Sequence, residues 1–262
     1  MTLDIYQIDA FTDHLFRGNP AAVCPLNEWM SDDMLQNIAK ENNLAETAYF
    51  IHIRDNVFHL KWFTPEIEMD LCGHATLASA YVIFKCLDYN LDTIIFRTLS
   101  GDLNVRMIGD QIEMDFPSRP ALKAELPKII KESLNIQPKE VYKSRDYMLV
   151  YDSEEEILNL SVNASALSQL NLDHGGIIVT SKGNNSDFVS RFFTPGAAVF
   201  EDPVTGSAHC TLIPYWADRL GKNDLFARQV SDRGGELWCR LKNDKVYIKG
   251  NAVKYLTGKI KV

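Results

Sequence analysis

The chain has 262 residues, of which 46% are hydrophobic and 24% are charged, with a formal net charge of −8 and a pI near 5.3. This length and composition suit one large or two medium globular domains. The acidic balance argues against a nucleic-acid backbone or an anionic membrane as a partner, but it leaves room for a small anionic substrate.

The beginning of the chain, Met1–Tyr6, has neither a basic nor an apolar stretch, so we expect no signal peptide. Charges interrupt every apolar segment well before the roughly 20 residues that a bilayer requires, so we expect no membrane span. The five cysteines are scattered without CxxC spacing. That distribution is typical of reduced thiols and favours a cytoplasmic protein.

The first half predicts seven strands and two helices. Residue alternation predicts the strands, and Ser31 and Gly73 begin the helices. In chain order these are strands at 4–11 and 21–24, the helix after Ser31, strands at 47–51 and 57–63, the helix from Gly73, and strands at 94–97, 103–106 and 111–114.

The second half repeats this order. Asn163 caps a helix opposite the Ser31 helix, and a second helix runs from Gly206 to about Leu220. The predicted strands lie at 176–179, 188–192, 227–230, 236–240 and 245–248.

The two halves share sequence as well as order. Lys61-Trp62-Phe63-Thr64-Pro65 returns as Arg191-Phe192-Phe193-Thr194-Pro195, at an offset of 192 − 62 = 130 residues. Cys72-Gly73-His74-Ala75 returns as Thr205-Gly206-Ser207-Ala208, at an offset of 205 − 72 = 133. Each copy is therefore the size of a domain rather than of a solenoid repeat.

This duplication predicts an α+β fold of two domains related by a pseudo-twofold axis, each a mostly antiparallel sheet around a central helix. Two prolines in Pro117-Ser118-Arg119-Pro120 interrupt both strand and helix patterns. We place the boundary there, giving domains of residues 1–116 and 117–262. The final segment, 254–262, is expected to cross back to the first domain.

A glycine turn opens the central helix of each copy, at Gly73 and at Gly206. A missing Cβ lets the backbone approach a ligand closely, and the first N–H groups of a helix have no internal partner. Two such turns facing one interdomain cleft, with His74 and Ser207 beside them, would hold a carboxylate or an incipient enolate. The alternative is that both glycines only permit close packing of helix on sheet.

Two carboxylates are each present in one copy only. Glu46 lies at the mouth of a strand, and the equivalent stretch at 174–177 has no acid, so Glu46 is a candidate for a single proton shuttle. Asp202 lies in a segment that is three residues longer than its counterpart, and it is a candidate acceptor for the substrate or for His74. The alternatives are a solvated glutamate and an Asx-Pro turn.

Cys72 raises two further alternatives. Two-base racemisation by a pair of thiols is excluded, because Thr205 occupies the position of the second cysteine. A zinc site formed by Cys72, His74, His209 and Cys210 matches no usual spacing of zinc ligands. We therefore expect no metal ion.

The motifs together resemble those of the phenazine-biosynthesis-like (PhzF) family, which shares the diaminopimelate epimerase fold. The matching segments are 9–12, 16–20, 43–48, 62–66, 70–76 and 201–208. In that family the glutamate matching Glu46 is the acid/base, and the residues matching His74, Asp202 and Ser207 line the same cleft. The phenazine enzymes themselves tend to lack a cysteine at the position of Cys72.

The resemblance implies a homodimer without a cofactor. We therefore expect a cofactor-independent isomerase that moves a proton between carbons of a small carboxylate metabolite. Glu46, His74 and Asp202 would be catalytic, and Gly73, Gly206 and Ser207 would bind the substrate. The alternatives are an epimerase that inverts one carbon with Cys72 as a base, and a non-catalytic metabolite-binding protein.

Overall fold

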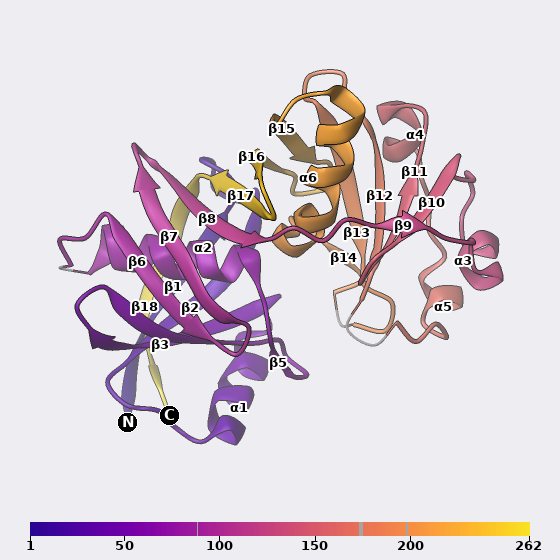
Figure 1. The fold of residues 1–262 in the computed structure, drawn as a ribbon. Helices are drawn as coiled ribbons and strands as arrows, with labels where there is room; N and C mark the ends of the chain where they lie inside the picture. Colours follow the sequence, from indigo (N-terminus) through magenta and orange to yellow (C-terminus); the bar gives the residue numbers. More distant parts are fainter. Residues whose placement is uncertain (88, 173–174, 198) are drawn as a thin grey trace. The chain divides into compact units, whose positions relative to one another are not determined.

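The computed structural model describes residues 1–87, 89–172, 175–197 and 199–262, and the chain divides into two compact units (Figure 1). Unit 1 contains Met1–Phe116 and Tyr247–Val262, and unit 2 contains Pro117–Val246. The expected boundary and this division agree at residue 116, but the segment that returns to unit 1 is longer than nine residues. Its strand β18 (Ala252–Lys261) pairs antiparallel with β1 (Thr2–Ala10) along its whole length.

The strands of unit 1 form a mixed sheet that is mostly antiparallel. Parallel pairing occurs between β2 and β3 and between β4 and β6, whereas β1–β2, β3–β4, β6–β7 and β7–β8 are antiparallel. A two-residue strand, β5, pairs antiparallel with the end of β4. The strand bounds are β2 Asn19–Leu26, β3 Glu46–Arg54, β4 Val57–Phe63, β5 Glu68–Met69, β6 Thr93–Thr98, β7 Gly101–Ile108 and β8 Gln111–Pro117.

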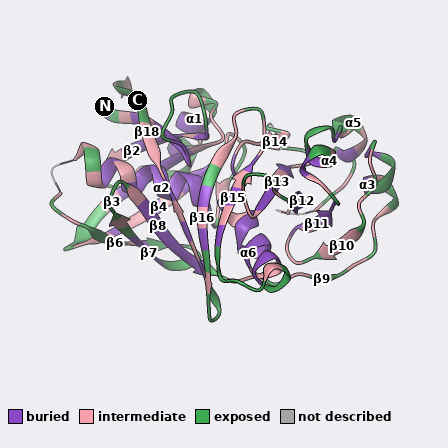
Figure 2. Ribbon diagram, turned by 90° about the horizontal axis from the view of Figure 1, so that it is seen from above, coloured by how far each residue is buried: buried purple, intermediate pink, exposed green. Residues whose placement is uncertain are grey.

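The central helix of unit 1 is α2 (Gly73–Tyr81), which continues as a π-helical turn over Val82–Cys86. Every residue from Gly73 to Ala80 is buried, and the helix packs against β1, β2, β3 and β18 (Figure 2). The predicted Ser31 helix is α1 (Asp32–Asn42), whose first turn is capped because Ser31 Oγ accepts the Met34 N–H.

Unit 2 repeats the pairing order of unit 1. The β10–β11, β12–β13 and β15–β16 pairs are antiparallel, and β11–β12 and β13–β15 are parallel. The predicted α+β fold, with a mostly antiparallel sheet and a central helix in each copy, is confirmed. The strand bounds are β9 Leu122–Lys123, β10 Glu140–Lys143, β11 Tyr147–Val150, β12 Ile177–Lys182, β13 Phe188–Phe193, β14 Glu201–Asp202, β15 Asp224–Gln229 and β16 Gly235–Lys242. The strand β17 (Lys245–Gly250) begins in unit 2 and continues into unit 1.

The helices of unit 2 differ from the expected set. The helix α6 (Gly206–Leu220) has the predicted bounds, but the Asn163 helix is only one turn, α5 (Ala164–Leu167). Two short helices, α3 (Lys128–Glu132) and α4 (Glu154–Leu158), lie where no element was predicted. These short helices cover a core of unit 2 that includes Leu149, Ile157, Val179 and Phe193.

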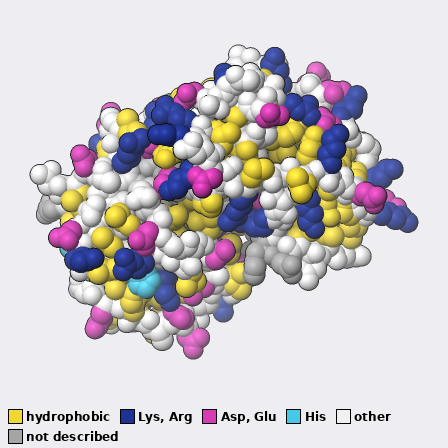
Figure 3. Space-filling model, viewed as in Figure 1, with side chains coloured by type: hydrophobic (Ala, Val, Ile, Leu, Met, Phe, Trp, Pro, Cys, Tyr) yellow, Lys and Arg dark blue, Asp and Glu magenta, His cyan; other side chains and the backbone are white. Residues whose placement is uncertain are grey.

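The described surface agrees with the composition. Among the described residues, no helix combines the length and apolarity needed to cross a membrane. On the face drawn in Figure 3, acidic and basic side chains of the described residues are interspersed rather than gathered by sign.

Candidate active site

Unit 1 brings Glu46 and His74 into direct contact. Glu46 begins β3, and His74 is the second residue of α2, so the strand mouth and the helix start present their side chains to each other. Glu46 Oε2 lies 2.9 Å from His74 Nε2, and the two side chains are 14% and 4% exposed. The carboxylate and the imidazole therefore form a nearly water-free acid/base pair.

The other edge of the His74 ring faces Asn19 and Cys72. His74 Nδ1 lies 3.1 Å from Asn19 Nδ2 and 3.6 Å from Cys72 Sγ. Burial disfavours a charged His74, but Cys72 and Glu46 favour it, and the pKa of His74 lies well above its usual range. Both ring nitrogens thus have partners within unit 1, and the partner of Nε2 is Glu46.

Cys72 is a poor base in this environment. Burial first, and then the neighbouring Glu46 charge, raise the pKa of the Cys72 thiol to about 11. Because proton abstraction requires the thiolate, almost all of this residue is in the unreactive form near pH 7. The environment of Cys72 favours Glu46 as the base.

Glu46, Cys72 and His74 also form a cluster with metal-ligand chemistry, since their ligand atoms lie within 4.8 Å of one another. The geometry does not suit one ion. Cys72 Sγ approaches Nδ1 of the His74 ring whereas Glu46 Oε2 approaches Nε2, so the two side chains engage different ring nitrogens. A zinc ion needs all of its ligand atoms at roughly 2.0–2.3 Å from one point. The cluster fits a largely buried acid/base site better than a metal site.

Both repeat helices begin without a side-chain cap. Ser31, Ser153 and Asn163 cap α1, α4 and α5 through side-chain oxygens. In contrast, Cys72 and Thr205 occupy the N-cap positions of α2 and α6 without forming a side-chain cap hydrogen bond. A helix start that no side chain caps can direct its N–H groups and partial positive charge toward an anion.

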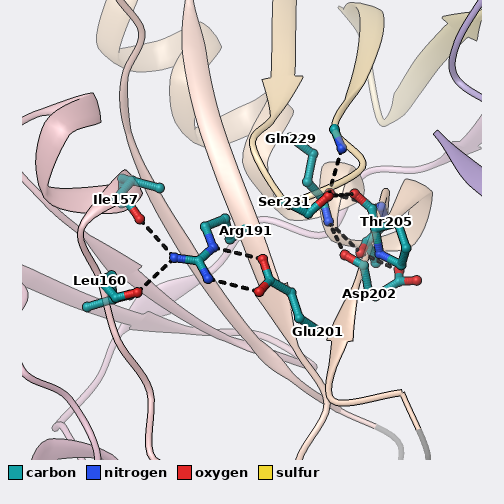
Figure 4. A network of polar contacts seen from close by, with 10 residues as sticks. Ile157, Leu160, Arg191, Glu201, Asp202, Thr205, Gln229 and Ser231 are labelled. Carbon is teal, nitrogen blue, oxygen red and sulfur yellow. Dashed lines mark hydrogen bonds and ion pairs between the residues drawn. The ribbon is translucent and has the colours of Figure 1, made fainter. Parts of the chain in front are cut away.

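In unit 2, Asp202 belongs to a network with Thr205 and Gln229 (Figure 4). The Thr205 hydroxyl donates to Asp202 Oδ2 at 2.5 Å. Gln229 accepts the Thr205 N–H through Oε1 at 2.9 Å, and its Nε2 donates to the Asp202 carbonyl at 2.7 Å. The loop between β14 and α6 is therefore held at both ends by one buried amide.

Ser207, the second residue of α6, contacts a cation. Arg145 Nη2 donates to Ser207 Oγ at 3.1 Å, while the same guanidinium forms two hydrogen bonds with Asp146. Asp146 in turn accepts the N–H of Gly176 at 2.8 Å. Unit 2 thus brings Asp202, Thr205, Gly206 and Ser207 to the start of one helix, as unit 1 does with Glu46, Gly73 and His74.

The strand register explains why only one copy carries the acid. Thr47 pairs with Phe63, and Ile177 pairs with Phe193, so Glu46 corresponds to Gly176. A Cβ at Gly176 would lie 2.3 Å from the Phe192 ring and 2.8 Å from the Phe193 carbonyl oxygen. No side chain fits at that position, so the second copy cannot carry a glutamate equivalent to Glu46. His174, in the same stretch, lies outside the described residues.

The same register shows what the loops before the turns have in common. Glu68 pairs with Phe63, and Glu201 pairs with Phe193, so these two glutamates correspond. Lys61 contacts Glu68 at 3.5 Å, and Arg191 forms two hydrogen bonds to Glu201 at 2.7 and 2.8 Å. Asp202 corresponds to Met69, so the second carboxylate is also specific to one copy.

Arg191→Met is expected to lower the free energy of unfolding by about 2 kcal/mol. The Arg191 guanidinium also donates to the carbonyls of Ile157 and Leu160, and it and Glu201 are only 15% and 25% exposed (Figure 4). Urea unfolding measures the loss. The corresponding cation, Lys61, contacts Asp32 and Glu68 through its single ammonium group and donates to no backbone carbonyl of the described residues, so Lys61→Met should cost under about 1 kcal/mol. Equal losses for the two variants would contradict this interpretation.

Two residues that complete these networks, Asn19 and Gln229, were not predicted as site residues. Asn19 is buried at the start of β2, inside the motif Phe16-Arg17-Gly18-Asn19-Pro20 that the family resemblance already used. That motif was the available signal for Asn19. Gln229 is a buried amide at the end of β15, and no local pattern distinguishes it.

The chain is similar to known proteins along nearly its whole length. Residues 8–258 match the family model described as phenazine biosynthesis-like protein. An uncharacterized isomerase of Pseudomonas aeruginosa is 48% identical over 258 residues, covering 98% of each chain. A crystal structure of a PhzF-family phenazine biosynthesis protein from Enterococcus faecalis matches with a TM-score of 0.94 and 42% identity, covering 100% of both chains.

A more distant structure shares the fold alone. A probable proline racemase from Agrobacterium radiobacter matches with a TM-score of 0.67 at 8% identity, covering 99% of this chain and 92% of that one. The fold is thus that of the racemases and epimerases, as the resemblance implied. The chain belongs to the phenazine biosynthesis-like family and is an isomerase.

Proposed function

We propose that this isomerase moves a proton from one carbon to another within a small carboxylate-bearing metabolite, without a cofactor. The observation that carries the proposal is the buried contact of 2.9 Å between Glu46 and His74 beside the uncapped start of α2. The contact supplies a base, a partner for that base and an anion-binding backbone within one unit.

In the proposed reaction, Glu46 accepts a proton as a substrate C–H bond breaks, and the electron pair moves into an enolate or dienolate. The carboxylic acid formed at Glu46 then gives the proton to a different carbon on the same face, which restores the carboxylate. His74 holds the Glu46 carboxylate through Nε2 and keeps it aimed at the substrate. Atoms and charges balance without any co-reactant.

In this proposal, the backbone N–H groups of the glycine turns lower the activation free energy more than the acid/base pair does. Positioned acid/base catalysis supplies about 10²–10⁴-fold, which is too little by itself for an unactivated C–H bond. One oxyanion donor in a dry site is worth roughly 2.7–4 kcal/mol. The N–H groups at Gly73 and His74 are the proposed donors in unit 1, and the duplicated turn at Gly206 and Ser207 is proposed to add the second set, with Asp202 as a further polar contact.

A panel of unsaturated and amino carboxylates, incubated with the protein in D₂O and followed by NMR, tests the proposal. We expect deuterium, or migration of a double bond, at a carbon other than the one that loses its proton. Heat-denatured protein and the Glu46→Gln variant are the controls. Loss and gain of hydrogen at a single inverted centre would instead support the epimerase alternative with Cys72.

A non-catalytic binding protein is the second alternative. It predicts that small carboxylates raise the melting temperature while no proton exchange occurs with any of them. The buried pairing of Glu46 with His74 favours catalysis, because a binding site gains little from holding a base in a water-free position. The homodimer and the cytoplasmic location implied by the resemblance and the cysteines belong to the same proposal, and light scattering on the purified protein tests the former.

A further inference from the structure

Thr205 occupies the position of the second cysteine in the epimerases. Its direct neighbours determine the direction of each hydrogen bond. Gln229 Oε1 accepts the Thr205 N–H, so the Gln229 amide group presents Nε2 on its other side, toward the Asp202 carbonyl. The same Nε2 lies 3.2 Å from Thr205 Oγ1 and donates to it (Figure 4).

A hydroxyl has one proton to donate. Because Gln229 Nε2 already donates to Thr205 Oγ1, the hydroxyl proton is directed to Asp202 Oδ2, 2.5 Å away. The result is a chain of donors that runs from Gln229 through Thr205 to the Asp202 carboxylate. A carboxylate that accepts such a bond is stabilised in its charged form.

Two titratable neighbours of this chain, Glu201 and His209, are held by other partners. The neighbouring Glu201 carboxylate faces Arg191, which it engages through both of its oxygens. His209 Nδ1 donates to the Thr205 carbonyl at 2.8 Å, and burial lowers the pKa of His209 to about 4, so this ring is neutral near pH 7. In unit 1 the corresponding residues, Met69 and Cys72, form no such pair, and Cys72 contacts His74 instead.

We propose that Thr205 is a positioning residue, which replaces the proton-transfer role of a cysteine with a fixed hydrogen bond that keeps Asp202 ionised and aimed in one direction. Asp202 then acts on the substrate as an anionic hydrogen-bond acceptor and not as a proton donor. The role of Asp202 toward the substrate rests on the proposed function, whereas the chain of hydrogen bonds can be tested without any substrate.

The test is a ¹³C NMR titration of the Asp202 carboxyl in the full-length protein labelled at aspartate, with Asp202→Asn used to assign the signal. Thr205→Val is expected to move the titration midpoint of Asp202 upward by roughly one pH unit, because the carboxylate loses a charge-stabilising donor. Thr205→Ser retains the hydroxyl and should restore the original midpoint. Thr205→Ala is the second variant if valine disturbs the fold.

Ser231→Ala is the matched control. Ser231 Oγ donates to the Pro203 carbonyl at 2.7 Å, so it tethers the same loop through its backbone. Its removal should leave the Asp202 midpoint unchanged. The inference is overturned if Thr205→Val titrates like the unmodified protein, or if Ser231→Ala moves the midpoint as far as Thr205→Val does. Neither result depends on finding the substrate, so failure here is distinct from failure of the proposed isomerisation.

Discussion

Replacing Glu46 by glutamine is expected to lower turnover by at least about 10²–10⁴-fold, the contribution of a positioned acid/base. Glutamine has nearly the same shape and keeps an oxygen near His74 Nε2, but it has no site that can accept and return a proton at neutral pH. Binding of a substrate carboxylate should persist, because the N–H groups at the start of α2 are unchanged. Steady-state kinetics measures the first effect, and thermal-shift titration with the substrate measures the second.

Two variants control for the loss of a carboxylate and for the rival base. Glu68→Gln removes a carboxylate from the same unit, where it contacts Lys61 and not His74, and should retain nearly full turnover. Cys72→Ala should also retain most turnover, because burial and the Glu46 charge raise the pKa of that thiol to about 11. An inactive Cys72→Ala variant beside an active Glu46→Gln variant would refute the proposed mechanism.

Much of the fold could be predicted because the signals are local and occur twice. The repeated motifs fixed the order of strands in each copy, Ser31 marked the start of α1, and Gly206 and Gly221 bound α6. In contrast, β10 and β11 have four residues each, too few for an alternation pattern to stand out. The final segment was expected to return to the first domain, but its pairing partner was not: β18 pairs with β1 and joins residues up to 259 positions apart, as in Thr2↔Lys261, which no local pattern contains.

The site was predictable in its residues but less so in its contacts. Glu46 and His74 were expected to share a site, and unit 1 brings them together. Asp202 was weighed as an acceptor for the substrate or for His74, and the structure adds a hydrogen bond to its carboxylate from the hydroxyl of Thr205. That hydrogen bond depends on the buried amide of Gln229, on a strand 24 residues further along the chain than Thr205. Because tertiary packing brings Gln229 to Thr205, the residues next to Thr205 in sequence do not predict this hydrogen bond.

The two histidines of the helix starts respond to pH in opposite directions. His74 has a raised pKa, so its contribution to stability is complete below pH 6.5 and is lost as the pH rises through the raised value. His209 is buried and neutral, and no described residue contacts its Nε2 by a hydrogen bond. Burial lowers the pKa of His209 from 6.5 to about 4, so its contribution is complete above pH 6.5. Stability is therefore lost as the pH falls, because His209 becomes protonated in the unfolded chain at a pH where it is still neutral in the folded protein.

Between pH 7.5 and pH 4, the stability of the unmodified protein should fall relative to that of His209→Gln by about 3 kcal/mol. The size follows from a pKa difference of 6.5 − 4 = 2.5 at about 1.36 kcal/mol per unit. Glutamine does not titrate and retains an N–H that can reach the Thr205 carbonyl, and both proteins contain His74, so its contribution cancels in the difference. Urea unfolding at intervals of half a pH unit measures the two curves. A constant difference across this range would mean that His209 becomes protonated in the folded protein as readily as in the unfolded chain, and the helix start that carries Thr205 would then be open to water.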